Sequence, residues 1–408
     1  MLLSFTISNY RSFKDKTTFT MEASATKTKP QNVVTIEKEK RHYKILKTSL
    51  VYGANASGKT SLIRAFHALC DEIRGVKNSY GGEFVSLYDP YILDNESSHN
   101  PSTMEVVFVV AGIKYRYFIK FDHQHYIEET LDYYPKGRVR ANLFSRMASA
   151  DGEHFPKYVS GIQAKERPAF SVFRNKLIIS KFLYDVPHPI IQPAVLFLSK
   201  IGFANSYNPN MKFALWEEGK ILLKDTNYSE RLKKILRFVD LGITDFTLSD
   251  QSEFLNTRFV HKSTNESNNT ILMAQESLGT STLFILGPKI LQALDNGTPL
   301  FVDELDSSFH SFISDFIIKM FTSQKINPKN AQLVIVTHDV TLMDEAHIRR
   351  DQVWFTQKNN NGISELFSLS DFDGVREDTP FAKWYLASKF GAVPTIESIE
   401  NLFDGQNN

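Results

Sequence analysis

Residues 53–60 of the chain read GANASGKT, and this stretch determines the fold around it. It matches G-x-x-x-x-G-K-[ST] in full, the pattern of a loop whose backbone N–H groups surround phosphate oxygens. Residues 45–52 (ILKTSLVY) predict a strand before it, and residues 62–73 after it place apolar side chains at helical spacing. A strand, a glycine-rich loop and a helix in this order predict a phosphate-binding unit of an α/β protein, whereas a chance glycine–lysine turn would lack this context.

The loop and the residue after it supply the candidate nucleotide ligands. The side chain of Lys59 is placed to reach the terminal phosphates, and the hydroxyl of Thr60 to bind Mg²⁺. The helix that starts here adds the positive end of its dipole. We therefore expect ATP and Mg²⁺ as cofactors, with the nucleotide bound by Gly53, Asn55, Ala56, Ser57, Gly58, Lys59, Thr60 and Ser61.

A second apolar strand ends in two acids. Residues 299–304 read PLFVDE, so Asp303 and Glu304 follow the strand at its carboxyl end, where the ligand crevice of a parallel sheet lies. Asp303 is placed to hold Mg²⁺, and Glu304 to act as the general base for the attacking water. An ordinary strand followed by an acidic turn is the alternative, which the upstream phosphate loop disfavours.

Two more segments complete an ordered set of motifs. Ser277 and Gly279 precede a predicted helix, where a hydroxyl, backbone N–H groups and the helix dipole suit an anion. An ordinary helix N-cap is the alternative for Ser277. His338 ends an apolar strand and is placed to contact a γ-phosphate or the water, although a lone histidine is more often a capping or core residue. We predict Lys59, Glu304 and His338 as the catalytic residues.

This order of motifs resembles the ABC ATPase superfamily, in its soluble branch of SMC, Rad50 and RecF-like proteins. The opening strand at residues 5–13 resembles that branch as well. The segments VYGANASGKTSL, ESLGTSTL, FVDELDSSFH, IVTHD, DQVWFTQK and KWYLASKFGAVP together resemble the AAA15 family of ATP/GTP phosphatases. The resemblance covers both nucleotide-binding lobes.

The resemblance implies a site shared between two chains. In such proteins two protomers enclose two ATP molecules, in a dimer or a higher even oligomer. Ser277 and Gly279 would then contact the γ-phosphate bound to the opposite protomer, and Asp306 would cross the interface. Arg11, with Ser12 beside it, would lie near the nucleotide.

The resemblance also implies the domain organisation. We expect an ABC-type ATPase head of α/β class, in which a phosphate-loop core sheet is joined by an antiparallel β subdomain. The expected divisions are an N-terminal ATPase lobe at residues 1–135 and a C-terminal ATPase lobe at 251–408. Between them, apolar residues at helical spacing, and not the resemblance, predict a mostly helical insertion at 136–250. The Q-loop that couples the lobes has no clear position, because both Gln124 and the Pro90–Tyr91 region are candidates.

The amino-acid composition limits the partners and the cellular location that we expect. The formal net charge of +1 argues against a surface dominated by one polyanionic partner. Cys70 is the single cysteine, so no internal disulfide can form and a reducing, cytoplasmic location is expected. The sequence has no apolar run of the roughly 20 residues that a membrane span needs, so no membrane partner is expected.

The sequence leaves three functions open. The leading hypothesis is an ATP-gated dimer that controls a partner effector. The family resemblance implies that it acts in bacterial anti-phage defence and that the effector is a nuclease or toxin, a Toprim-like nuclease included. The others are a nucleic-acid clamp gated by ATP and a low-turnover scaffold that holds an effector inactive. A basic run beside aromatic residues would support nucleic-acid contact, although a solvated hairpin tip is the commoner cause; the run consists of Lys136, Arg138, Arg140 and Arg146.

Overall fold

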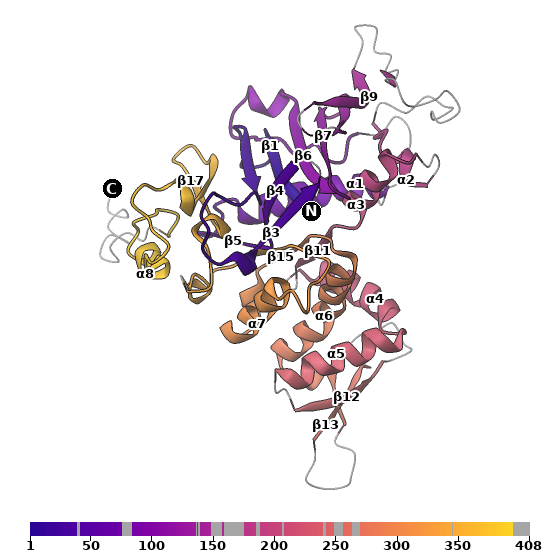
Figure 1. Cartoon of the computed structure of the whole chain (residues 1–408), viewed down its shortest axis with the longest axis vertical. Coiled ribbons are helices and arrows are strands. Elements are labelled where there is room, and N and C mark those ends of the chain that lie inside the picture. Colours follow the sequence, from indigo (N-terminus) through magenta and orange to yellow (C-terminus); the bar gives the residue numbers. More distant parts are fainter. Residues whose placement is uncertain are drawn as a thin grey trace, which may run out of the picture.

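Two large β-sheets hold one helix between them in the computed structural model of the chain (Figure 1). The structure describes residues 1–38, 41–75, 84–135, 137, 139–147, 157–158, 175–184, 188–205, 208–239, 242–248, 256–262, 270–344 and 346–394. The helix is α1 (Lys59–Arg74), which starts directly after the phosphate loop. One sheet is antiparallel and the other is mostly parallel, which confirms the expected α/β class with a core sheet and an antiparallel β subdomain.

The core sheet has six strands in the order β11-β15-β16-β5-β17-β18. They are β5 (Thr48–Gly53), β11 (Gly202–Asn205), β15 (Leu300–Asp303), β16 (Leu333–Val336), β17 (Val353–Lys358) and β18 (Ser364–Ser368). The first five run parallel and β18 pairs antiparallel with β17. Because β16 lies between β5 and β15, the loop after β16 is placed between the phosphate loop and the two acids at the end of β15, Asp303 and Glu304.

The antiparallel sheet has seven strands in the order β10-β9-β8-β7-β6-β1-β2. They are β1 (Leu2–Ser8), β2 (Thr17–Thr20), β6 (Ser102–Val110), β7 (Ile113–Phe121), β8 (Tyr126–Tyr134), β9 (Ala141–Met147) and β10 (Lys157–Tyr158). Buried residues alternate along β6 and β7, as expected for a sheet with one covered face. Two smaller sheets are the hairpin of β3 (Val33–Lys38) with β4 (Arg41–Leu46), and β12 (Ile243–Thr247) with β13 (Arg258–His261) and β14 (Thr270–Leu272).

Helix α1 is the packing centre between the two large sheets. The ring of Phe66 stacks on Phe5 of β1 with centroids 4.5 Å apart, and meets Phe301 of β15 edge-on at 5.1 Å. On the other face of the core sheet, side chains such as Leu50 and Val302 belong to a second cluster. That cluster includes residues of α6 (Leu278–Asn296) and α7 (Ser311–Thr322). The core strands are therefore covered on both faces, as their continuous apolar runs predict.

The stretch expected as a helical insertion, residues 136–250, contributes strands to both large sheets. β9 extends the antiparallel sheet, and β11 forms the edge of the core sheet beside β15. Its described helices are α2 (Lys181–Tyr184), α3 (Ile191–Ser199), α4 (Pro209–Leu222) and α5 (Thr226–Phe238). The N-cap of α5 is Asp225, whose carboxylate accepts from the Asn227 N–H at 2.7 Å. The division of the chain into domains stays a proposal.

The basic run is not a continuous surface, which corrects the expectation for Arg146. Its guanidinium is fully buried and forms an ion pair with Glu129 at 2.9 Å. Glu129 also accepts from the backbone N–H groups of Ile178 and Ile179 at 2.7 and 2.9 Å. This pair therefore fastens the segment before α2 to the antiparallel sheet. Arg140 is largely exposed, and Lys136 and Arg138 lie outside the described residues.

The last described helix is α8 (Phe381–Leu386). An amphipathic helix predicted over residues 395–403 lies outside the described residues. Among the described residues, no helix is both long enough and apolar enough to cross a membrane.

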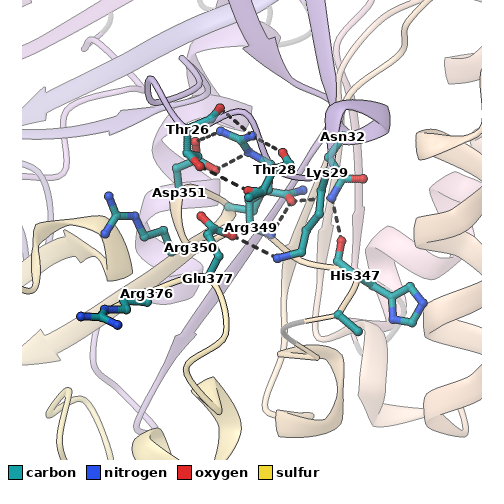
Figure 2. A network of polar contacts seen from close by, with 12 residues as sticks. Thr26, Thr28, Lys29, Asn32, His347, Arg349, Arg350, Asp351, Arg376 and Glu377 are labelled. Atoms are coloured by element: carbon teal, nitrogen blue, oxygen red, sulfur yellow. Dashed lines mark hydrogen bonds and ion pairs between the residues drawn. The ribbon is translucent and has the colours of Figure 1, made fainter. Parts of the chain in front are cut away.

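A buried polar network joins the loop before β3 to the segment that leads into β17 (Figure 2). Arg349 is almost fully buried, donates to the carbonyl of Thr28 at 2.6 Å and pairs with Asp351 at 2.6 Å. Beside it, Lys29 pairs with Glu377 at 3.0 Å. Residues from near both ends of the sequence are thereby held together beside the segment that leads into β17.

We expect Arg349→Met to lower the free energy of unfolding by about 3–5 kcal/mol, because the Asp351 carboxylate loses its cation while staying buried. Urea unfolding of both proteins measures the change. The control is Lys319→Met, which removes a half-exposed ion pair with Asp315 and should cost about 0–1 kcal/mol. Equal effects of the two substitutions would contradict this account of the network.

Candidate functional site

A cavity of about 460 Å³ lies where β5, β15 and β16 end. Its lining joins the phosphate loop to residues from the loops that follow the other two strands. The cavity brings together the predicted site residues Arg11, Asn55, Ala56, Ser57, Gly58, Lys59, Thr60, Ser61, Glu304 and His338. These come from segments up to some three hundred residues apart, so the parallel strand order of the core sheet is what assembles them.

The backbone of the phosphate loop is held against β17 and β18. The hydroxyl of Ser57 lies 2.5 Å from that of Thr356, and the hydroxyl of Ser364 donates to the Ser57 carbonyl at 2.6 Å. Gly58 has φ +121, and a Cβ at this position would lie 2.5 Å from the Ser364 Oγ. Gly53, with φ +152, is confined in the same way by the backbone of Thr356. Glycine is therefore required at both positions by conformation and by space.

Lys59 lies under the loop with its ammonium buried. It donates to the carbonyls of Gly53 and Ala54 at 2.8 and 2.9 Å. Burial lowers the pKa of Lys59 to about 8, although Asp303 and Glu304 favour the charged form. The Lys59 ammonium, which is predicted to contact the phosphates, is thus held inside the loop by two carbonyl oxygens. A phosphate oxygen can replace these acceptors.

Asp303 and Thr60 converge at the position predicted for the metal. The Thr60 hydroxyl donates to Asp303 Oδ1 at 3.4 Å, and the amide of Asn205 donates to Oδ2 at 3.0 Å. Burial, and next the charge of Glu304, raise the pKa of Asp303. One hydroxyl and one carboxylate fit Mg²⁺, which takes few protein ligands and fills its shell with waters and substrate phosphates.

Glu304 lines the cavity from a strained backbone position. Its φ is +56, in the left-handed region that a residue with a Cβ rarely adopts. The short helix η6 (Leu305–Ser307) follows, and the Ser307 N–H and hydroxyl donate to the Glu304 carbonyl at 3.2 and 2.9 Å. Such a conformation costs of order 1–3 kcal/mol and is concentrated at functional sites, where surrounding contacts hold it in place.

His338 enters the cavity from the loop after β16. Burial, followed by the charge of Lys59, lowers the pKa of its imidazole, so the neutral form is favoured at neutral pH. Its backbone N–H donates to Asp306 Oδ2 at 2.9 Å. Asp306, which the family resemblance placed across a dimer interface, therefore makes this contact within its own chain.

The turn at Ser277 and Gly279 does not line the cavity of its own chain. The Ser277 hydroxyl accepts from the Thr280 N–H at 3.1 Å, which makes Ser277 the N-cap of α6. A Cβ at Gly279 would lie 3.0 Å from the carbonyl of Ser308, so the turn packs closely on the segment after η6. Between them lies Leu278, with a side chain that is 58% exposed. The capping role is observed, and an anion-binding role stays a prediction.

Arg11 and the Pro90–Tyr91 region form another part of the lining. The Arg11 guanidinium pairs with Asp89 at 3.1 Å, which fixes it at the edge of the cavity. Of the two Q-loop candidates, Pro90 and Tyr91 contribute to the cavity, whereas Gln124 lies in the turn between β7 and β8.

Sequence reasoning missed several residues of the site. Asn205 ends a strand of four residues, too short to produce a periodic pattern inside a stretch read as helical. Lys358, the last residue of β17, and Gly362, in the polar turn that follows, also line the cavity. Polar turns of this kind are common in sequences, so no local signal marks this one.

Lys59 predicts a pH-dependent difference in stability. In the folded chain its pKa is about 8, below the ordinary value of 10.5 that the unfolded chain retains. Between these values the unfolded chain binds more protons, so the contribution of Lys59 to stability rises with pH. The free energy of unfolding of the native chain minus that of Lys59→Met should therefore increase from pH 8 to pH 10, measured by urea unfolding. A difference that stays constant over this range would contradict the assignment.

Comparison with known proteins identifies a family whose model covers most of the site residues. The family model described as "AAA domain, putative AbiEii toxin, Type IV TA system" (AAA_21) matches residues 49–344. The matched range contains the phosphate loop, the turn at Ser277, the acids after β15 and His338. Among curated proteins, no sequence matches this chain.

Several solved structures are similar in outline. The SMC head domain from Thermotoga maritima has a TM-score of 0.40 at 12% identity, covering 90% of this chain and 98% of that one. An SMC head bound to the C-terminal winged-helix domain of ScpA scores 0.40 at 11% identity, covering 90% and 97%. The recombination mediator protein RecF-ATPrS scores 0.35 at 11% identity, covering 90% and 98%. Scores this low support no conclusion about the site.

Proposed function

Because this chain belongs to the AAA_21 family of AAA domains, we propose that it binds ATP with Mg²⁺ in the cavity at the phosphate loop and hydrolyses it. The observation that carries the proposal is the meeting of Lys59, Glu304 and His338 in one cavity beside Asp303. The broader expectation of an ABC/SMC-like ATPase agrees with this family. The closer resemblance to AAA15 proteins is part of the proposal.

The residues around the cavity suit phosphoryl transfer to water. Glu304 accepts a proton from the water that attacks the γ-phosphorus, while the bond from that phosphorus to the β,γ-bridging oxygen breaks. ADP and phosphate are the products. Lys59 and the N–H groups of the loop stabilise the charge on the phosphoryl oxygens, and neutral His338 is placed to hydrogen-bond to the γ-phosphate or the water. Mg²⁺ held by Thr60 and Asp303 would neutralise charge on the β- and γ-phosphates.

We extend the proposal to a dimer of this chain. The turn at Ser277 caps α6 outside its own cavity and carries the exposed Leu278, so it is available to a second copy. In that arrangement Ser277 and Gly279 would complete the cavity of the partner, and hydrolysis would open the dimer.

The biological output is also a proposal. The family description names a putative toxin of a type IV toxin–antitoxin system. ATP-gated control of a nuclease or toxin effector in bacterial anti-phage defence rests on the resemblance of the sequence motifs alone. A nucleic-acid clamp has less support, because Arg146 of the basic run is buried in an ion pair. A low-turnover scaffold would need Glu304 to be inactive.

Glu304→Gln tests the chemistry. We expect ATP hydrolysis to fall about 100-fold or more, since an amide cannot accept the proton, while ATP affinity stays within about twofold of the native value. Phosphate release and calorimetric titration measure the two quantities. Lys59→Ala should weaken ATP binding itself.

The control is Glu365→Gln on β18, an exposed glutamate that does not line the cavity. It should leave hydrolysis unchanged. Undiminished hydrolysis by Glu304→Gln, or an equal loss in Glu365→Gln, would refute the proposed role of Glu304.

A further inference from the structure

One part of the cavity lining has no role in binding phosphates. Ile92 and Leu93 both line the cavity, although 74% and 68% of their side chains are exposed. Adjacent large aliphatic side chains with this exposure are unusual in a water-facing loop, because burying them in a complex would be favourable. They lie in the same cavity as the phosphate loop and are therefore within reach of one bound molecule.

The segment that carries these side chains is fastened at the edge of the site. The Tyr91 N–H donates to the Asn9 side chain at 3.1 Å, and the Tyr91 hydroxyl donates to the Asn361 carbonyl at 2.5 Å. The second contact joins the segment to the turn between β17 and β18. The wall of the cavity is therefore preorganised by contacts to two other segments.

Leu93 lies directly against that turn. A Cβ added at Gly362 would be 2.7 Å from the Leu93 Cδ1. Gly362 has φ +77 and itself lines the cavity. The aliphatic side chains and the turn thus form one continuous surface, which we call the apolar wall: Ile92, Leu93 and Gly362.

The cavity consequently contains an anion-binding part and an apolar part, and Arg11, Asp89 and Lys358 are also in its lining. The phosphate loop offers N–H groups and an ammonium to an anion, whereas the apolar wall offers only uncharged surface. A triphosphate gains nothing from aliphatic side chains, but the uncharged faces of a base and a ribose do. A nucleoside triphosphate has both parts joined covalently, which fits a cavity built in this way.

We propose that Ile92 and Leu93 form the surface on which the nucleoside part of the bound nucleotide lies, with Gly362 leaving the space that the Leu93 side chain occupies against the turn. This inference rests on the proposed ATP-binding function and assigns residues to the half of the ligand that the phosphate loop does not contact. It predicts that the wall contributes to affinity only for ligands that carry a base and ribose.

The test compares two ligands with the double variant Ile92→Ser/Leu93→Ser. ATP and inorganic tripolyphosphate, each with Mg²⁺, are titrated calorimetrically into the native chain and the variant. We expect the Kd for ATP to rise about tenfold, because apolar contact is lost, and the Kd for tripolyphosphate to change less than about twofold. Ile221→Ser on α4 is the matched control: Ile221 is 68% exposed and does not line the cavity.

Three results would overturn the inference. An unchanged Kd for ATP would show that the wall does not contact the nucleoside, and changed self-association in the same variant would then assign it to a protein contact. An equal loss for ATP and tripolyphosphate would show a general distortion of the site. A native chain that bound neither ligand would refute the proposed function and the inference with it, whereas failure of the wall alone leaves ATP binding intact.

Discussion

The close packing of the phosphate loop against β17 and β18 is the constraint on which the site depends. Gly53 and Gly58 adopt conformations and contacts that no side chain would permit, and hydroxyls of Ser57 and Ser364 fix the loop to its neighbours. Because the loop is fixed, the Lys59 side chain is held beneath it and α1 starts with its N-terminus at the loop. The network around Arg349 contributes from a distance, because it holds the segment that leads into β17.

Buried charges and a strained backbone position lie close together at the cavity. Burial lowers the pKa of Lys59 while Asp303 and Glu304 favour its charged form, and burial together with the charge of Glu304 raises the pKa of Asp303. Glu304 lines the cavity in a left-handed backbone conformation, which costs free energy. Removing Asp303 or Glu304 would therefore lower the pKa of Lys59 further, because each acid favours the charged ammonium.

The residues closest to the phosphate loop could be predicted from the sequence, because each follows a recognisable strand or begins a helix. The loop itself, Asp303 with Glu304, and His338 all belong to this group, and the structure places them in or beside one cavity. Asn205 and the apolar wall could not be predicted, since their positions depend on strand pairing and turns between segments far apart in the chain. Arg146 looked like a surface cation because its partner, Glu129, lies on the neighbouring strand and is not visible in the local pattern.

The proposed dimer, in which each ATP site is completed by a second copy of the chain, is tested most directly by mixing two inactive variants. Lys59→Ala disables the phosphate loop, and Ser277→Asp keeps a good N-cap for α6 while placing a negative charge where the partner's γ-phosphate would lie. Each variant alone should be inactive, whereas an equal mixture should recover about a quarter of native ATP hydrolysis, because half of the dimers are mixed and each contains one intact site of two. A mixture as inactive as its components would contradict the shared site.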